Sequence, residues 1–558
     1  MKKIGLLFIW GWLLMGAVQA QTANLHERLN VALSPSEKRF NQHGTDMEVR
    51  QLMGLYANPS YYEWTHTEDS LLKRTVYRSS VYTGYANGEV KGDFLPYEGN
   101  AFYDYRMGAN GEYAIRKVGT LFGQVQYARG KHRNVGWNAM RYPELYLPYI
   151  STDSIGGDYT YEDYLIKGGY AFTLGQWKLG VNGEFHGEQA WRKTDPRALN
   201  KTTWLKFGLG ASKMFNGHLL MAQADICRNK QHLELRYWRP GEQDRFFVCY
   251  GFGLYDIRQS KVAFGYSRMY YISEGGVRFT YQSPLDRKLN VYASLGYEYD
   301  YMKTEETNIC DLYYSKTHSL LPSVKVDFKP ADQWVFSLWM EGNMDMRKGF
   351  ENIFERYQSD VANNIYDYRL IDTQQQYDFT RMDMLAQLRA RYQFTPQQSI
   401  SLLGGVSALS REEKYKMANY KVKNASMFPH GRMDYQLRVK QSELQLAVLY
   451  GKKVNGDNSY NVRMNNTEVE HLDFQHAFAP YAYYNSTYTA LDVSAQYVYH
   501  FKKCALGVSA KLMYRNGERD REASFDGKIG YPSTAPMVTT IPDKHDELWG
   551  NTSVFFMF

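Results

Sequence analysis

The most chemically suggestive stretch is GEFHGE, residues 183–188, in which Glu184, His186 and Glu188 occupy alternate positions. Alternate residues of a β-strand point to the same face, so these three side chains would lie together. A histidine between carboxylates can act as a general acid or base, and that is one interpretation. The other is a hydrated polar network inside the protein. We favour the network and predict no catalytic residue here.

A second group of ionisable residues falls in the stretch NNTEVEHLDFQH, at Glu468, Glu470, His471, Asp473 and His476. Carboxylates and imidazoles together can bind a divalent metal, but this spacing matches no standard metal motif. The simpler interpretation is a solvated acidic loop, so we predict no metal site and no cofactor. The chain also has no G-x-S-x-G motif, which disfavours a lipase-type enzyme. We therefore do not expect an enzyme.

Tyrosine-rich stretches at 142–149 and 478–488 permit two interpretations. They could form a stacking surface for sugars or peptides. They could also belong to an aromatic girdle at a membrane interface, where a ring is half buried and its hydroxyl is wet. We favour the girdle for tyrosines close to strand ends.

The four cysteines, Cys227, Cys249, Cys310 and Cys504, are scattered without metal-ligand spacing. If the protein is exported, a disulfide is permitted, and Cys227 and Cys249 could flank one hairpin. Unpaired cysteines within strands are the alternative, and the sequence leaves both open.

The elements that would position these residues are long strands, because apolar and polar residues alternate over extended runs. Typical strands of soluble proteins have only about 5–6 residues. One face of each run is apolar and the other carries charge, as expected for a barrel with lipid outside and a polar interior. Leu295 and Val493 lie on the predicted lipid face. The predicted lumen-facing candidates are Glu184, His186, Glu298, Asp300, Asp492, His500, Lys511 and Arg515.

Eight tight turns separate the runs, near 116–117, 174–177, 215–218, 283–288, 329–334, 395–399, 439–442 and 501–504. Between them lie long polar connections at 132–157, 192–202, 239–257, 350–377, 457–484 and 519–545. Short turns at one end and long loops at the other are typical of outer-membrane barrels. With both chain ends in the periplasm, eight turns predict a transmembrane antiparallel β-barrel of about 18 strands, with 16 as the alternative.

The last residues, DELWGNTSVFFMF, alternate with period two and end on Phe558. Terminal residues of soluble domains usually fray and are polar. An apolar terminal strand instead predicts a barrel that closes on itself, with Phe558 at the closure.

Composition supports a barrel and excludes two other classes. The chain of 558 residues has 49 Tyr, 28 Phe and 11 Trp, yet its mean hydropathy is −0.55. A helical membrane protein would contain several runs of about 18 or more apolar residues. The net charge of +7 is spread along the chain, so nucleic acid is not an expected partner.

The N-terminus predicts export. Residues 1–20 combine two lysines, an apolar run and a small-residue cleavage site after Ala20, which indicates a signal peptide. Residues 21–70 form a predicted periplasmic segment with a short helix, in which Thr45 and Glu48 could make a capping box. That helix could cap the barrel, enter its lumen or tether it. Residues 71–558 form the predicted barrel.

The stretch 121–200, including YPELYLPYISTDSIGGDYTYEDYLIKGGYAFTLGQW, resembles a family of Bacteroidota outer-membrane barrels of uncharacterised function, as does the Phe-ended last strand. The resemblance implies an outer-membrane barrel and supplies no catalytic residues. It also implies companionship with a nutrient-uptake complex. An outer-membrane barrel would contact membrane lipids, lipopolysaccharide and the barrel-assembly machinery.

A predicted outer-membrane barrel is compatible with three functions. The first is a narrow or plugged channel that passes small solutes, with the lumen residues setting selectivity. The second is a non-conducting accessory or binding barrel. The third, least favoured, is an outer-membrane hydrolase.

Overall fold

The computed structural model describes residues 47–65, 78–92, 94–115, 118–153, 155–236, 246–251, 255–259, 266–306, 309–417, 420–461, 480–481, 483–518 and 544–558. The predicted signal peptide and capping residue Thr45 lie outside these ranges, as does the acidic stretch 465–476.

Antiparallel strands dominate the fold. The barrel strands are β1 (Ser79–Gly92), β2 (Ala101–Ile115), β3 (Gly119–Val135), β5 (Gly157–Leu174), β6 (Trp177–Arg192), β7 (Arg197–Phe215), β8 (His218–Arg236), β11 (Tyr266–Gln282), β12 (Leu289–Glu306), β13 (Ile309–Ala331), β14 (Trp334–Asp360), β15 (Ile365–Thr395), β16 (Gln398–Tyr415), β17 (Tyr420–Val439), β18 (Ser442–Asn455), β20 (Thr487–His500), β21 (Ala505–Glu518) and β22 (Lys544–Met557). A three-residue strand, β19 (Ser459–Asn461), pairs with β17 beside the loop end of β18.

The sheet closes because the first and last strands pair. β1 and β22 are antiparallel, with Val81 opposite Phe556. Beyond β22 the Phe558 N–H donates to the Ser79 carbonyl at 3.0 Å, and the Ser79 N–H donates back to the Phe558 carbonyl at 3.0 Å. Nineteen strands form the sheet, and all except β19 build the ring. The predicted count of 18 is therefore confirmed, and the 16-strand alternative is wrong.

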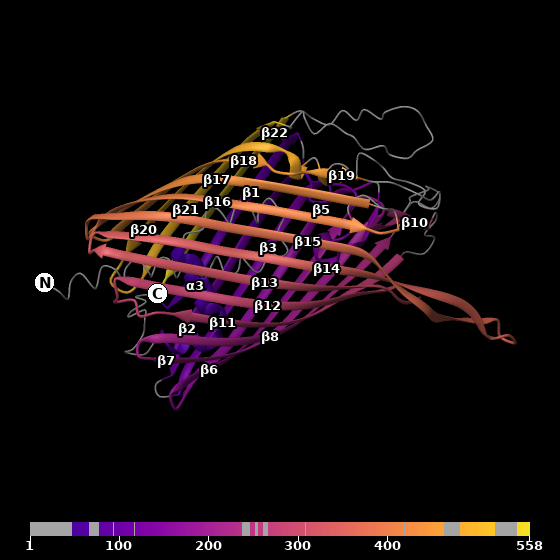
Figure 1. The fold of residues 1–558 in the computed structure, drawn as a ribbon, viewed down its shortest axis with the longest axis horizontal. Helices are drawn as coiled ribbons and strands as arrows, with labels where there is room; N and C mark the ends of the chain where they lie inside the picture. Colours follow the sequence, from indigo (N-terminus) through magenta and orange to yellow (C-terminus); the bar gives the residue numbers. More distant parts are fainter. Residues whose placement is uncertain are drawn as a thin grey trace.

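The two ends of the barrel differ. Seven of the predicted turns lie at one end, together with Phe558, and we call this the turn end. The eighth predicted turn, at 116–117, lies outside the described residues. The opposite rim is the loop end. Two predicted loops are wrong: only residues 193–196 separate β6 from β7, and residues 350–377 belong mostly to β14 and β15. Those two strands continue as a hairpin well past the loop-end rim (Figure 1), because alternating residues can pair as a ribbon without a wall beside them.

The inward and outward faces follow the predicted alternation. Leu295 has 50% of its surface exposed, whereas its neighbour Ser294 has 6%; Val493 is 41% exposed and Asp492 6%. The outer surface carries other large apolar side chains on many strands, including Val125, Ile166, Leu209, Phe279, Leu388, Leu402 and Val508. Trp339, Phe555 and Met557 point inward and are buried.

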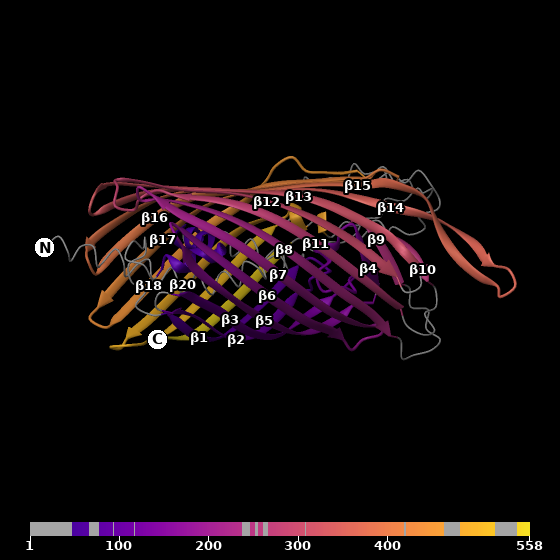
Figure 2. The same cartoon turned by 90° about the horizontal axis from the view of Figure 1, so that it is seen from below.

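Smaller elements lie within this wall. They are the helix α3 (Met47–Ala57), the 3-10 helices η1 (Pro59–Glu63) and η2 (Pro143–Tyr146), and a sheet of β4 (Tyr149–Asp153), β9 (Phe246–Tyr250) and β10 (Tyr255–Gln259). Figure 2 shows the small sheet toward the loop end. None of the described helices has the length and apolar character that crossing a membrane would require.

Candidate functional site

The N-terminal segment 47–65 fills the lumen near the turn end, and we call it the plug. Its apolar residues, such as Leu52 and Tyr56, join one buried cluster with wall residues from seven strands between β3 and β16. The wall members of that cluster are Phe122, Ala171, Leu219, Met221, Tyr292, Trp339, Leu385 and Leu403. Of the three placements that the sequence left open, the structure selects entry into the lumen. The described part of the predicted N-terminal segment, 47–65, therefore lies inside the barrel.

Ion pairs fasten the plug to one side of the wall. Glu48, in the first turn of α3, accepts from Arg389 Nη1 at 2.5 Å and from Arg391 Nη2 at 3.0 Å. Lys325 Nζ lies 3.9 Å from the same carboxylate and donates to Gln51 at 3.0 Å. A carboxylate at a helix N-terminus is also favoured by the helix dipole.

Another side of the plug sits against two glycines. Gly180 of β6 and Gly210 of β7 are directly paired. A Cβ on Gly180 would lie 2.4 Å from the Pro59 carbonyl carbon, and one on Gly210 would lie 2.0 Å from Asn58 Oδ1. The Asn58 amide also donates to a β8 carbonyl at 2.8 Å. The missing side chains thus allow the plug backbone to touch the wall.

A second closure occupies the loop end. The segment around η2 and β4, with β9, packs in one buried cluster with wall residues such as Leu233 and Tyr313. Tyr149 stacks on Tyr313 with ring centres 4.5 Å apart, and the Tyr146 hydroxyl donates to Asn229 at 2.6 Å. We call this group the loop-end cap.

The cap revises two expectations about the loops. Tyr146 and Tyr149 are fully buried, so they form neither a girdle nor an open stacking surface; Tyr483 and Tyr484 are buried in the same cluster. No disulfide joins Cys227 to Cys249. Burial raises the pKa of the Cys249 thiol, which keeps it protonated.

Between the plug and the cap, the wall of β8, β11 and β12 carries a group of carboxylates. Glu274 is opposite Asp300, and Gly276 is opposite both Asp225 and Glu298. Because Gly276 has no side chain, its neighbours face a shared gap on the inner surface. The predicted lumen residues Glu298 and Asp300 thus meet Asp225 and Glu274, which the sequence analysis had not named. We call these four side chains the acidic group.

The predicted basic residues lie on the far wall. In the strand order around the barrel β21 is eight places from β12, which is almost diametrically opposite. Arg515 of β21 pairs with the buried Glu547 at 3.2 Å, while Lys511 faces the side of the lumen that carries Asp492. His500 sits apart at the turn end, 3.5 Å from Glu443.

The stretch 183–188 is only partly the predicted cluster. His186 and Glu188 face the lumen side and are buried, but Glu184 is opposite Lys167 and Lys206 instead. The third member of the cluster is Asp163 of β5, which is opposite Glu188. Its Oδ2 lies 2.5 Å from His186 Nε2. The polar residues of YEDYL, 161–165, could have pointed to Asp163 as a candidate. The pairing register of β5 with β6, which places Asp163 opposite Glu188, could not be obtained from the sequence.

Comparison with known proteins gives a family and distant structural similarities. The model of a family described as "Family of unknown function (DUF6850)" matches residues 70–532. A search of curated proteins finds no significant match.

Among solved structures, the chain is similar to BauA, the ferric preacinetobactin receptor from Acinetobacter baumannii, at 10% identity, with 86% of this chain and 80% of that chain covered and a TM-score of 0.36. The FrpB iron transporter from Neisseria meningitidis is 9% identical, with 87% of this chain and 83% of that chain covered and a TM-score of 0.35. The ferripyoverdine receptor of the outer membrane of Pseudomonas aeruginosa is 8% identical, with 87% of this chain and 72% of that chain covered and a TM-score of 0.35. At these values the substrates of those proteins do not transfer to this chain.

Proposed function

The chain belongs to a protein family of unknown function, DUF6850, and we propose that it is a normally closed outer-membrane barrel that admits a small polar solute when its two closures are displaced. The chain would be exported by residues 1–20, with its turn end in the periplasm and its loop end outside. The continuous apolar outer face supports this placement, since lipid would cover it.

The observation that carries the proposal is the polar interior between two closures made of short segments. Oxygen atoms of the acidic group, Asp225 Oδ1 and Asp300 Oδ1, are buried and accept no hydrogen bond from the described residues. Unsatisfied buried acceptors in a folded protein usually have a water or an ion beside them. Lys206 lies 3.8 Å from Asp225 and from Glu274 and offsets only part of the negative charge of the four carboxylates. A hydrated interior with such a wall would suit the passage of a polar or cationic solute.

The closures are suited to displacement. The plug is a single segment of 19 described residues, 47–65, at the N-terminal side of the barrel, and no wall strand passes through it. Among the described residues no backbone hydrogen bond joins it to a wall strand; side chains hold it, through the shared apolar cluster and the ion pairs of Glu48 with Arg389 and Arg391. Release of the plug would therefore leave the strand pairing of the barrel intact, although separating the buried ion pairs is costly unless water or a partner replaces them. Membrane lipids, lipopolysaccharide, the barrel-assembly machinery and a nutrient-uptake complex are the proposed partners.

Planar-bilayer recording tests the proposal. We expect the wild type to stay at baseline current. A variant that lacks the plug, 47–65, and both segments of the loop-end cap, 137–155 and 237–265, should conduct steadily. In that background Glu298→Gln with Asp300→Asn should shift ion selectivity toward anions. The matched control is Glu355→Gln with Asp367→Asn, which removes the same two charges from the hairpin outside the barrel.

The outcomes separate the candidate functions. A steady wild-type conductance would show an open pore and contradict the closed state. A folded variant that lacks the plug and both cap segments and does not conduct would favour the second candidate, a binding barrel. The projecting β14–β15 hairpin is the observation that favours that candidate, because it presents exposed apolar side chains away from the wall, among them Tyr357, Val361 and Leu370.

A further inference from the structure

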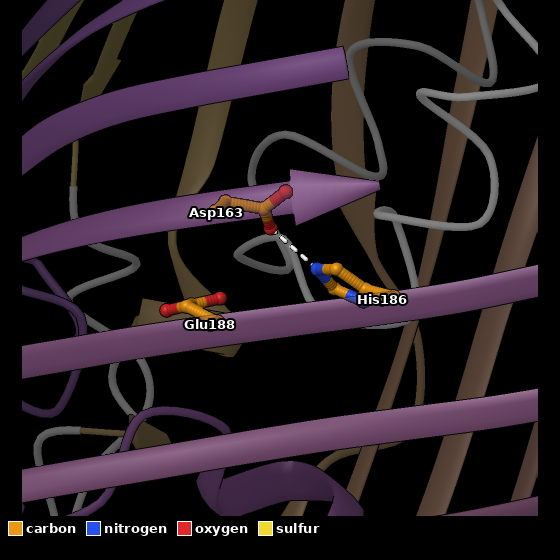
Figure 3. Close-up of side chains that lie close together, drawn as sticks. All are labelled: Asp163, His186 and Glu188. Carbon is orange, nitrogen blue, oxygen red and sulfur yellow. Dashed lines mark hydrogen bonds and ion pairs between the residues drawn. The ribbon is translucent and has the colours of Figure 1, made fainter. Parts of the chain in front are cut away.

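Asp163, His186 and Glu188 form a compact group on two neighbouring wall strands. Asp163 and Glu188 are directly opposite each other on β5 and β6, and His186 precedes Glu188 by two residues on the same face. One donor atom from each side chain lies within 4.8 Å of the donor atoms of the other two. Figure 3 shows the Asp163 carboxylate turned toward the His186 ring, with Glu188 beside them.

The group is buried but not internally satisfied. The exposed fractions are 2% for Asp163, 7% for His186 and 5% for Glu188. Asp163 Oδ1 and Glu188 Oε2 accept no hydrogen bond from the described residues. An unpaired buried carboxylate oxygen is costly, so it requires a ligand, water or ion that would satisfy it.

The surrounding side chains hold the group in place without occupying those two oxygens. The His186 ring stacks on Trp204, its cross-strand neighbour, with centres 4.3 Å apart and planes 10° apart. Arg141, from the segment that leads into the loop-end cap, binds the other oxygen of Glu188. Arg141 is in turn placed over the Tyr161 ring at 4.1 Å.

We propose that Asp163, His186 and Glu188 bind a divalent first-row transition-metal ion, such as Zn²⁺. Zinc takes imidazole nitrogen and carboxylate oxygen ligands at about 2.0–2.2 Å, so two ligands of one ion lie at most about 4.4 Å apart. The observed 4.8 Å therefore requires only a small inward movement of the side chains. Three protein ligands leave a further position for water or a solute group.

Charge also favours a cation. With neutral His186, the two carboxylates carry two negative charges and Arg141 compensates one of them. A divalent ion would replace the hydrogen bond between His186 Nε2 and Asp163, and would engage the open oxygens of both carboxylates. Glu188 can keep Arg141 on its other oxygen. This inference goes beyond the proposed function and does not depend on solute passage.

The alternative is an ionic network without metal, in which His186 is protonated and pairs with Asp163 while Arg141 pairs with Glu188. That network satisfies one oxygen of each carboxylate and leaves the other for water. This network predicts no specific metal binding, so titration of the protein with metal ion distinguishes the two interpretations.

The experiment uses the full-length protein, folded in detergent and stripped with a chelator. Zn²⁺ binding is measured by calorimetry, and Co²⁺ binding by its visible absorption, which reports nitrogen and oxygen ligation directly. We expect one site per chain that is weakened by Glu188→Gln and by His186→Gln. Replacing a ligand should cost at least the tenfold or so that is typical of lost supporting groups around a metal.

Glu184→Gln is the matched control, because it makes the same change on the same strand and face, four residues from Glu188 and two from His186, where Lys167 and Lys206 are the cross-strand neighbours. It should leave Zn²⁺ affinity within about twofold of the wild type, well under the change expected for a ligand. Heat-modifiable migration identifies folded variants, and Asp163→Asn provides a third ligand variant if one of the others misfolds. Equal Zn²⁺ binding by wild type and all ligand variants, or none by the wild type, would overturn the proposal.

Discussion

At the scale of single residues, the contact between Gly210 and the plug leaves no room for a larger side chain. Gly210→Leu would place a side chain where Asn58 now lies. Overpacking of this kind costs about 1–3 kcal/mol, so the seated plug should be disfavoured by about tenfold or more. Arg50 of the plug is buried and paired with Glu341. We therefore expect trypsin cleavage after Arg50, followed by mass spectrometry, to accelerate by a similar factor.

Gly168→Leu serves as the comparison for this substitution. Gly168 is on the outer face of β5, and a Cβ there meets nothing within 4 Å. Cleavage after Arg50 should stay at the wild-type rate. If Gly210→Leu is equally protected, the plug does not depend on the paired glycines for its seat.

At the scale of elements, the outer face of β12 tests where the membrane lies. Leu295→Arg should destabilise the folded protein in lipid vesicles by about 2–4 kcal/mol, the cost of arginine on a lipid face near the middle of the membrane. Leu370→Arg makes the same substitution at a residue with the same exposure, 51% against 50%, on the projecting hairpin. Denaturant titration should show a change of less than about 0.5 kcal/mol there. Equal costs would mean that the two sites share one environment.

The same hairpin should be dispensable for the barrel. β13 accompanies β14 only as far as Glu351, and β16 accompanies β15 only from Tyr377. Ile353 and Asp372 are opposite each other, so an Asn-Gly turn can join them in place of residues 354–371. We expect the shortened protein to keep its heat-modifiable migration and its denaturation midpoint. A lower midpoint would reveal a contribution of the ribbon to the wall.

Turns and strand faces could be predicted from the sequence where neighbouring residues alone determine them. Turn residues located the seven turns that lie within the described residues, and the period of two identified the inward face of β12, because both signals are local. The loop predicted over 350–377 was wrong, since its polar residues form a ribbon that has solvent on both faces. Polarity alone does not distinguish such a ribbon from a loop.

The candidate site was less accessible to sequence reasoning. Glu48 and Arg389 are 341 residues apart, and no periodicity links them. The contribution of Asp163 depends on the register between β5 and β6, which a one-residue shift would abolish. Tyr146 and Tyr149 read as surface aromatics because the sequence does not indicate that their loop folds inward.

At the scale of the whole molecule, the last residue extends the seam that closes the barrel. Deleting Phe558 removes backbone hydrogen bonds to Ser79 and Arg78 at the seam between β1 and β22. We expect a clear loss of folded, heat-modifiable protein in the membrane. Phe558→Ala keeps those backbone bonds and should assemble better than the deletion, whereas Phe558→Lys adds a charge beside lipid.

Phe394→Lys separates the seam from a general effect of charge. Phe394 has the same exposure as Phe558, 53% against 52%, but lies on β15 away from the seam. It should assemble better than Phe558→Lys. Wild-type assembly of the deletion would contradict a role of the terminal residue in closure.

The plug is joined to β1 by residues 66–77, and the shortness of this connection has a kinetic consequence. Thirteen peptide steps from residue 65 to residue 78 reach at most about 45 Å when fully extended. A released plug therefore stays close to its own seat, at an effective concentration on the order of millimolar. Reseating would be fast and independent of protein concentration. A free peptide of residues 47–65 would have to approach millimolar levels to compete, and a lasting open state would require a partner that holds the plug away.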